Sequence, residues 1–219
     1  MTWTNKHSFY TYTNPNDPYK KYTTDNDNKF TAVLNDQPGM EVLGEVAAYD
    51  KIIAEAKLMG YDFIELAQKR RHLDMPKYPN TDKIYHSWFY CKCDNLELWR
   101  EMHPQASELL LAACQIICQK YPEYSHAVNV HLRSNLIFQH SMFAMSLDKF
   151  ERYNNWLHSI FCRLELPPEP AKVGSLLAER LFTIWVLHNY GFKDHEFVTA
   201  SAYDKVTGQK VECCNGVCD

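Results

Sequence analysis

The sequence lacks the features that mark membrane and secreted proteins. No apolar run reaches the roughly 18 residues that a membrane-spanning helix needs. The first 22 residues are polar and aromatic, without the apolar core of a signal peptide. Basic residues are not in excess, because 23 Lys and Arg stand against 27 Asp and Glu, which gives no sign of a broad nucleic-acid surface. We therefore expect a cytoplasmic protein without a membrane span, free in the cytosol or peripheral to a membrane.

Several common functional motifs are also missing. No G-x-x-x-x-G-K or G-x-G-x-x-G loop is present, which excludes the usual phosphate-binding loops. No G-x-S-x-G nucleophile elbow is present either. The nearest approach to a metal-binding Asp-x-Asp is 25–27, in a predicted loop, and this pattern is common by chance.

The eight cysteines have no paired C-x-x-C spacing, so we expect mainly free thiols in a reducing compartment. Cys114 and Cys118 lie four residues apart in an apolar helical run and are predicted core residues. A zinc site made by Cys91, Cys93 and the cysteines of the C-terminal tail is the alternative.

Helical and extended patterns alternate along the chain. This order predicts one α/β domain over 1–219, with a mixed sheet flanked by helices. We expect an irregular segment with one strand at 1–38 and a flexible cysteine-containing tail at 205–219. Strands are predicted at 7–13, 61–68, 136–146 and 196–204, and a strand or short helix at 84–93. Helices are predicted at 41–59, 107–120, 147–165 and 174–189.

Two arginines follow one predicted strand directly. Arg70 and Arg71 come after 61–68, and ligands of open α/β sheets bind beyond the carboxyl ends of strands. Guanidinium groups there suit phosphate, because they stay charged and donate in a fork. The alternative is that 69–72 is a solvated loop.

Two further polar residues interrupt apolar patterns. Glu45 lies near the apolar face of the predicted helix 41–59, as a site residue or a helix-capping contact. His140 interrupts the apolar strand 136–146, where a hydrogen-bonded core histidine is the usual finding.

The predicted helix 174–189 is apolar nearly all round, yet it carries Glu179 and Arg180 side by side. Such a helix is buried on most sides. Neighbouring helical residues point about 100° apart, so these two do not face each other. Each therefore needs its own partner or a polar cleft, since burying an unpaired charge is costly. Two structural salt bridges are the alternative to a functional site.

Read together, these stretches resemble a known family. YDFIELAQKRRHL (61–73) is similar to a family segment in which a D-Y-I-G-L strand leads into H-Y-R-R-Y, with Arg70 and Arg71 as the matching arginines. The family's His before them is replaced here by Gln68 or Lys69.

The resemblance continues over roughly 40–190. KYPEY (120–124) and QHSMFAMSLDKFERYNNWL (139–157) resemble the next family elements. A G-x-x-x-x-E-R-L-x-x-x-W helix follows, matched by Gly174, Glu179, Arg180, Leu181 and Trp185. The family is a bacterial domain of unknown function found in capsular and exopolysaccharide gene clusters, and its members are regarded as glycosyltransferases.

The resemblance implies a GT-A-like, Rossmann-related glycosyltransferase, either hexosyl- or pentosyltransferase. It would use a nucleotide-diphosphate sugar, of which a UDP-sugar is the first choice, with Mn or Mg as a candidate metal. It implies Arg70 and Arg71 for the diphosphate, Glu45 for the donor, and His140 for donor or acceptor. Glu179 would be the base or hold an acceptor hydroxyl, and Arg180 a second anchor.

The acceptor implied by the family is a polysaccharide or a lipid-linked glycan. One alternative is a hydroxymethylated base in viral DNA, which would call for a basic groove with aromatic residues. The other is a non-catalytic protein with the same fold that binds nucleotide sugars or glycans.

Overall fold

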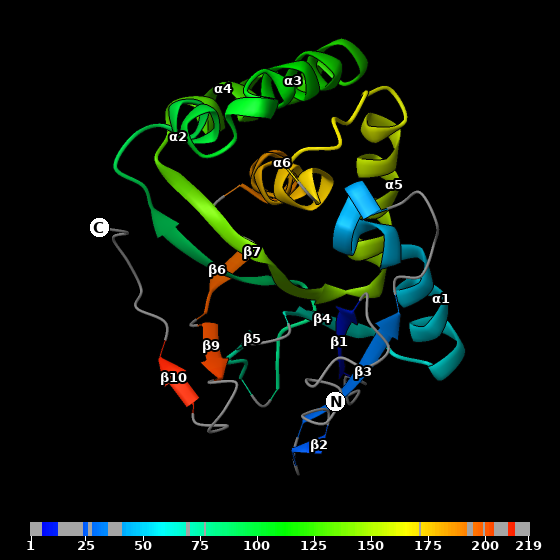
Figure 1. Cartoon of the computed structure of the whole chain (residues 1–219). Coiled ribbons are helices and arrows are strands. Elements are labelled where there is room, and N and C mark those ends of the chain that lie inside the picture. The colour runs from blue at the N-terminus through cyan, green and yellow to red at the C-terminus, as the bar shows by residue number, and fades with distance from the viewer. Residues whose placement is uncertain are drawn as a thin grey trace.

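The computed structural model has an α/β fold built on two sheets (Figure 1). It describes residues 6–12, 24–25, 28–34, 41–68, 71–76, 78–170, 172–191, 195–198, 200–203 and 210–212. The larger sheet has the strand order β2-β3-β1-β4-β7-β6-β8, and the smaller one β10-β9-β5. The helices cover one face of the larger sheet (Figure 1). None of the described helices is long and apolar enough to cross a bilayer.

The strands are β1 (Lys6–Tyr12), β2 (Thr24–Asp25), β3 (Asn28–Leu34), β4 (Phe63–Ala67), β5 (Arg71–Leu73), β6 (Ile84–Tyr90), β7 (Leu136–Ser146), β8 (His195–Phe197), β9 (Ala200–Tyr203) and β10 (Lys210–Glu212). The α-helices are α1 (Tyr49–Met59), α2 (Asn95–Met102), α3 (Leu109–Lys120), α4 (Ser125–Arg133), α5 (Leu147–Phe161) and α6 (Val173–Tyr190). The 3-10 helices are η2 (Glu41–Ala48), η3 (Pro104–Ala106) and η4 (Pro122–Tyr124).

The larger sheet is mixed, as the alternating sequence pattern predicts. β1 is parallel to β3 and β4, and β6 is parallel to β8. β7 runs antiparallel to both of its neighbours, β4 and β6. Because side chains alternate along a strand, β4 sends Ile64 into the main core and Phe63 into a smaller cluster on the opposite face.

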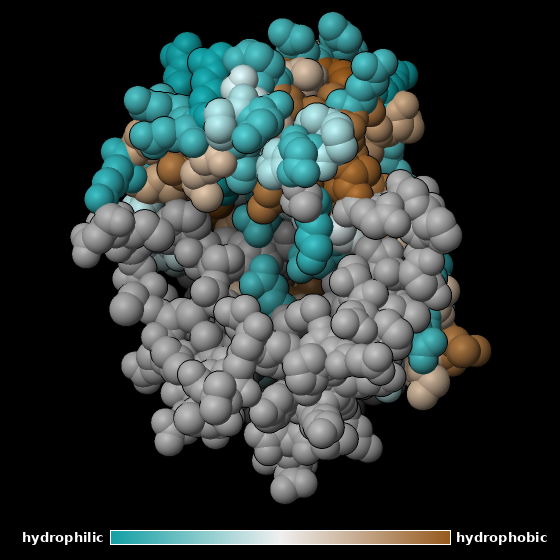
Figure 2. Space-filling model, viewed as in Figure 1, coloured by the Kyte–Doolittle hydropathy of each residue, from teal (hydrophilic) through white to brown (hydrophobic). Residues whose placement is uncertain are grey.

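Helix α6 lies between the sheet and the layer formed by α2, α3 and α4 (Figure 1). This position explains why its sequence is apolar nearly all round. The outer surface of the helical layer is mainly hydrophilic in this view, and a hydrophobic area lies where α3 and α5 approach each other (Figure 2).

The middle of β7 contains a bulge. His86 pairs with Phe143, whereas Trp88 pairs with Phe138, so 139–142 lie opposite Ser87 alone. Bulges bend a strand and redirect its side chains, and they are common beside active sites. His140 belongs to this bulge.

The predicted helix 41–59 is wrong as a single element. It divides into η2 and α1, and Gly44 within η2 has φ 56° and ψ −127°, a conformation outside the helical region. Only glycine adopts such a conformation at low cost.

The N-terminal prediction is also wrong in its number of strands. We expected one strand in 1–38, but β2 and β3 follow β1 there, and β3 pairs in parallel with β1. The Asp- and Asn-rich stretch before β3 favours turns, and the pairing that stabilises a parallel strand is remote in sequence.

Near the C-terminus, the strand predicted at 196–204 divides into β8, at the edge of the larger sheet, and β9, in the smaller one. Of the tail at 205–219, only β10 lies within the described residues. The sequence pattern also gave no indication of α2 or α4, which are short.

Candidate functional site

Helix α6 lies across the bulge of β7. Phe182 stacks on Phe143, with ring centroids 4.6 Å apart, on one side of the bulge. On the other side, the backbone N–H of Phe138 donates a hydrogen bond to Thr183 Oγ1 at 3.3 Å. The bulge is therefore held against one defined face of α6.

Glu179 belongs to that same face. It precedes Thr183 by one helical turn, and residues three and four apart in a helix are neighbours on its surface. Its side chain is half-buried. Glu179 also lies near Tyr153, whose pKa is raised well above 10.0, first by burial, then by Tyr49 and then by the charge of Glu179.

Glu45 lies beside the first turn of α6. Its backbone N–H donates to Ser175 Oγ at 2.7 Å, and that hydroxyl donates to Leu43 O at 2.9 Å. Glu45 therefore lies at the contact between η2 and α6, one helical turn before Glu179.

Gly174 and Gly44 make this contact possible. A Cβ at Gly174 would lie 2.9 Å from Leu43 Cα, and one at Gly44 would lie 2.5 Å from Ser175 Oγ. Both distances are too short for a real side chain, so the two backbones can approach this closely only because both residues are glycine.

The predicted phosphate-binding arginines follow β4 in the sequence. Arg70 lies outside the described residues, and Arg71 begins β5, where it pairs with Ala202. β5 lies beside β4 and β7, so the backbone of Arg71 is close to the strand that carries His140. Of the side chains of Arg71 and His140, the structure describes nothing.

Glu65 holds β5 in this position. Its carboxylate Oε1 accepts a hydrogen bond from the backbone N–H of Leu73 at 2.9 Å, and the residue is 2% exposed. Sequence reasoning missed this role, although a Glu in the apolar strand FIELA is a usable signal. It also missed Ser87, which lies opposite the bulge and whose buried Oγ has no hydrogen-bond partner among the described residues.

Arg180 points away from the bulge, as helical spacing predicts. It is 4% exposed. Burial lowers its pKa, while Glu179 and Cys91 oppose that change. Its charge, acting after burial, lowers the pKa of His103 and lowers that of His131 to about 3. Arg180 therefore lies toward the helical layer formed by α2 and α4.

The predictions for the cysteines and for a metal site can be compared with the structure only in part. Cys114 is buried, as predicted, and Cys118 is half-buried. Among the residues that the structure describes, no three His, Cys, Asp or Glu side chains gather as a metal site. The tail cysteines and two residues of the 25–27 motif lie outside the described part of the chain.

Comparison with solved structures shows the same fold in a glycosyltransferase. The apo structure of the bifunctional glycosyltransferase WbbM superposes with a TM-score of 0.64 at 17% identity, over 99% of this chain and 47% of that one. The chain thus spans about half the length of WbbM. Core-mannan synthase A (CmsA/Ktr4) from Aspergillus fumigatus, in its Mn/GDP form, has a TM-score of 0.46 at 12% identity, over 97% of this chain and 79% of that one.

No curated protein matches the chain. The family model described as "Domain of unknown function (DUF4422)" matches residues 19–190. That span contains β4, the bulge of β7 and the whole of α6. The chain therefore belongs to the DUF4422 family.

Proposed function

We propose that the protein is a GT-A-like glycosyltransferase that moves a sugar from a nucleotide-diphosphate donor to a hydroxyl of a polysaccharide or lipid-linked glycan. One observation carries the proposal: α6 packs on η2 at Ser175, beside Glu45, and on the bulge of β7 at Thr183, and Glu179 lies on the helical turn between these two contacts. The likeness of the fold to WbbM supports it.

The reaction breaks the bond between the anomeric carbon and the donor's phosphate oxygen, and forms a bond from that carbon to the acceptor oxygen. The nucleoside diphosphate leaves with the bonding electrons, so positive charge must meet it. We assign this to Arg70 and Arg71, because guanidinium groups donate in pairs to phosphate oxygens. The described residues offer no metal-ligand cluster.

The acceptor hydroxyl must lose its proton as the new bond forms. We assign Glu179 to accept that proton or to hold the hydroxyl, since a half-buried carboxylate can do either. Glu45 and His140 would contact the donor sugar or the acceptor. Arg180, buried on the other side of α6, is assigned to positioning the helix that carries Glu179.

The test measures hydrolysis of UDP- and GDP-sugars and transfer to glycan acceptors. Glu179→Gln should lower transfer about 100-fold or more while the protein stays folded, since it removes the proton acceptor. Arg70→Ala and Arg71→Ala should reduce the thermal stabilisation by the cognate nucleoside diphosphate. Glu165→Gln is the matched control, because Glu165 is exposed in the connection between α5 and α6.

Wild-type transfer rates in both Glu179→Gln and Arg70→Ala would refute these assignments. A wild-type protein that responds to no nucleotide, with or without Mn²⁺, would instead identify a non-catalytic binding protein. Salt-sensitive DNA binding would identify DNA as the acceptor.

A further inference from the structure

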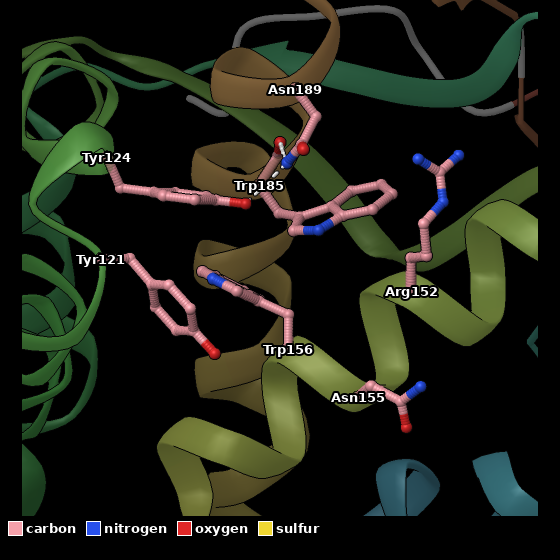
Figure 3. A pocket seen from close by; sticks show the side chains of 7 residues that line it. All are labelled: Tyr121, Tyr124, Arg152, Asn155, Trp156, Trp185 and Asn189. Atoms are coloured by element: carbon pink, nitrogen blue, oxygen red, sulfur yellow. Dashed lines mark hydrogen bonds between the residues drawn. The ribbon is translucent and has the colours of Figure 1, made fainter.

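A pocket lies on the helical side of the molecule, between α5, α6 and η4. Its volume is about 330 Å³. That is near the lower end of the roughly 300–1,000 Å³ typical of small-molecule sites. Its aromatic lining comes from three separate stretches of sequence: Tyr121 and Tyr124, Trp156, and Trp185 (Figure 3). These are stretches that carry the family resemblance but have no role in the donor site.

The aromatic walls of the pocket are fixed before any ligand arrives. Tyr124 stacks on Trp156 at 5.4 Å between ring centroids. Its hydroxyl accepts a hydrogen bond from Asn189 Nδ2 at 2.7 Å, and the same nitrogen donates to Trp185 O at 2.9 Å. The Tyr121 hydroxyl is 2.9 Å from Ser159 Oγ. Such preorganisation lowers the entropy cost of binding.

The indole N–H of Trp156 is a donor without an acceptor in the wall of the pocket. Trp156 is only 6% exposed, and its Nε1 is buried with no hydrogen-bond partner in the described part of the chain. The nitrogen points toward the space between Tyr121 and Tyr124 (Figure 3). A buried donor without an acceptor is costly, so a ligand oxygen that reached Nε1 by a small shift of the surrounding side chains would gain the missing bond.

The polar groups of the pocket suit a neutral ligand with many hydroxyls. Asn155 offers an exposed amide that can both donate and accept, and the exposed Asn189, whose two N–H groups are already bonded, offers its carbonyl oxygen as an acceptor. The single cation in the lining, Arg152, already pairs with Asp148 at 3.1 Å. One partly neutralised cation is a poor match for a diphosphate. Aromatic rings suit the C–H groups of a sugar ring. Tyr124 already stacks on Trp156 and His188, so the half-buried ring of Tyr121 is the one open to such a contact.

We propose that this pocket binds a pyranose ring of the glycan acceptor, at a residue that does not itself react. That the bound ring belongs to an acceptor rests on the proposed glycosyltransferase function, whereas the binding of a sugar does not. Glu179 and Asn189 lie about 15 Å apart along the axis of α6, given the rise per residue of a helix. That is farther than one sugar ring reaches, so the bound ring belongs to a different unit of the glycan from the reacting hydroxyl.

The experiment titrates the full chain with methyl pyranosides of glucose, galactose and mannose and with their disaccharides, by saturation-transfer NMR and tryptophan fluorescence. Trp156→Phe keeps a ring and removes the N–H, and Asn155→Ala removes an exposed amide. Each should weaken sugar binding about threefold to tenfold, the worth of one hydrogen bond. Arg163→Ala, which changes an exposed residue just beyond α5, is the matched control and should bind as the wild type does.

Failure to bind any of these sugars, or equal binding by wild type and both pocket variants, would overturn the proposal. Hydrolysis of the nucleotide sugar with water as acceptor, measured in parallel, separates the two proposals because it needs no glycan. Sugar binding without hydrolysis would support the sugar-binding pocket and refute the proposed function. Hydrolysis without sugar binding would support the proposed function and refute the sugar-binding pocket.

Discussion

The contact between η2 and α6 depends on glycine at two positions, and three alanine substitutions test that dependence. Gly44 combines a positive φ of 56° with a Cβ position 2.5 Å from Ser175 Oγ. Gly174 has the close contact but no positive φ, and Gly60 has φ 70° with nothing within 4 Å of its Cβ position. The three variants thus separate backbone strain from steric overlap.

Gly60→Ala should lower the free energy of unfolding by about 1–2 kcal/mol, because alanine is strained in the left-handed backbone conformation. Gly174→Ala should lower the free energy of unfolding by about 1–3 kcal/mol, because the added methyl group overpacks the contact. A gain in helix propensity of up to about 1 kcal/mol offsets part of that. Gly44→Ala carries about 1–3 kcal/mol of backbone strain. The overlap adds about 1–3 kcal/mol more. Ser175 cannot rotate away cheaply, because its hydroxyl holds hydrogen bonds to Glu45 N and Leu43 O.

Urea unfolding followed by circular dichroism gives the free energy of unfolding of each variant. Gly44→Ala should be the least stable of the three. Gly174→Ala should also lose transfer activity while folded, because η2 must move away from α6 and take Glu45 with it. Equal stability of Gly44→Ala and Gly60→Ala would refute the argument, since it would show that the contact with Ser175 adds nothing.

Two further stability predictions concern α6 and its neighbours. The pKa of His131 is lowered to about 3 from its ordinary 6.5, first by burial and then by Arg180. Between about pH 3 and pH 6.5, His131 therefore binds a proton in the unfolded chain but not in the folded chain. The contribution of His131 to the free energy of unfolding is fully present above pH 6.5 and is lost as the pH falls. The urea midpoint should fall between pH 7 and pH 5, and His131→Asn should reduce this fall; an equal fall in both proteins would contradict the assignment. Thr183→Val should cost about 1 kcal/mol or somewhat more, because the N–H of Phe138 loses its acceptor at nearly constant side-chain volume. A variant as stable as wild type would show that this hydrogen bond does not hold the bulge.

The long elements were predictable because their patterns are local. β4, β7, α5 and α6 each contain enough apolar residues at one period to define the element and its buried side. The same reasoning failed at β3, whose stability comes from parallel pairing with β1, and at Gly44, where a break within η2 interrupts a helical pattern. Neither a remote strand partner nor an unusual glycine conformation leaves a periodic signal.

The candidate site was predictable in part. Its carboxylates, Glu45 and Glu179, were chosen as polar residues in apolar surroundings, and the structure places the backbone of Glu45 against Ser175, one helical turn before Glu179. The β-bulge around His140 was not predictable, because a bulge depends on how two strands pair. The aromatic pocket was not predictable either, because it forms where three distant stretches of chain meet. In the sequence, Trp156 and Trp185 have the pattern of ordinary core residues.

The sequence by itself determined that Glu179 and Arg180 point in different directions, because the helical repeat sets the angle between neighbours. It also determined that their helix is buried on most sides. Only the tertiary structure decided what lies near each one: Tyr153 of α5 for Glu179, and the layer of α2 and α4 for Arg180. Local periodicity states which residues share a face of a helix, but the partner on that face comes from packing between segments far apart in the chain.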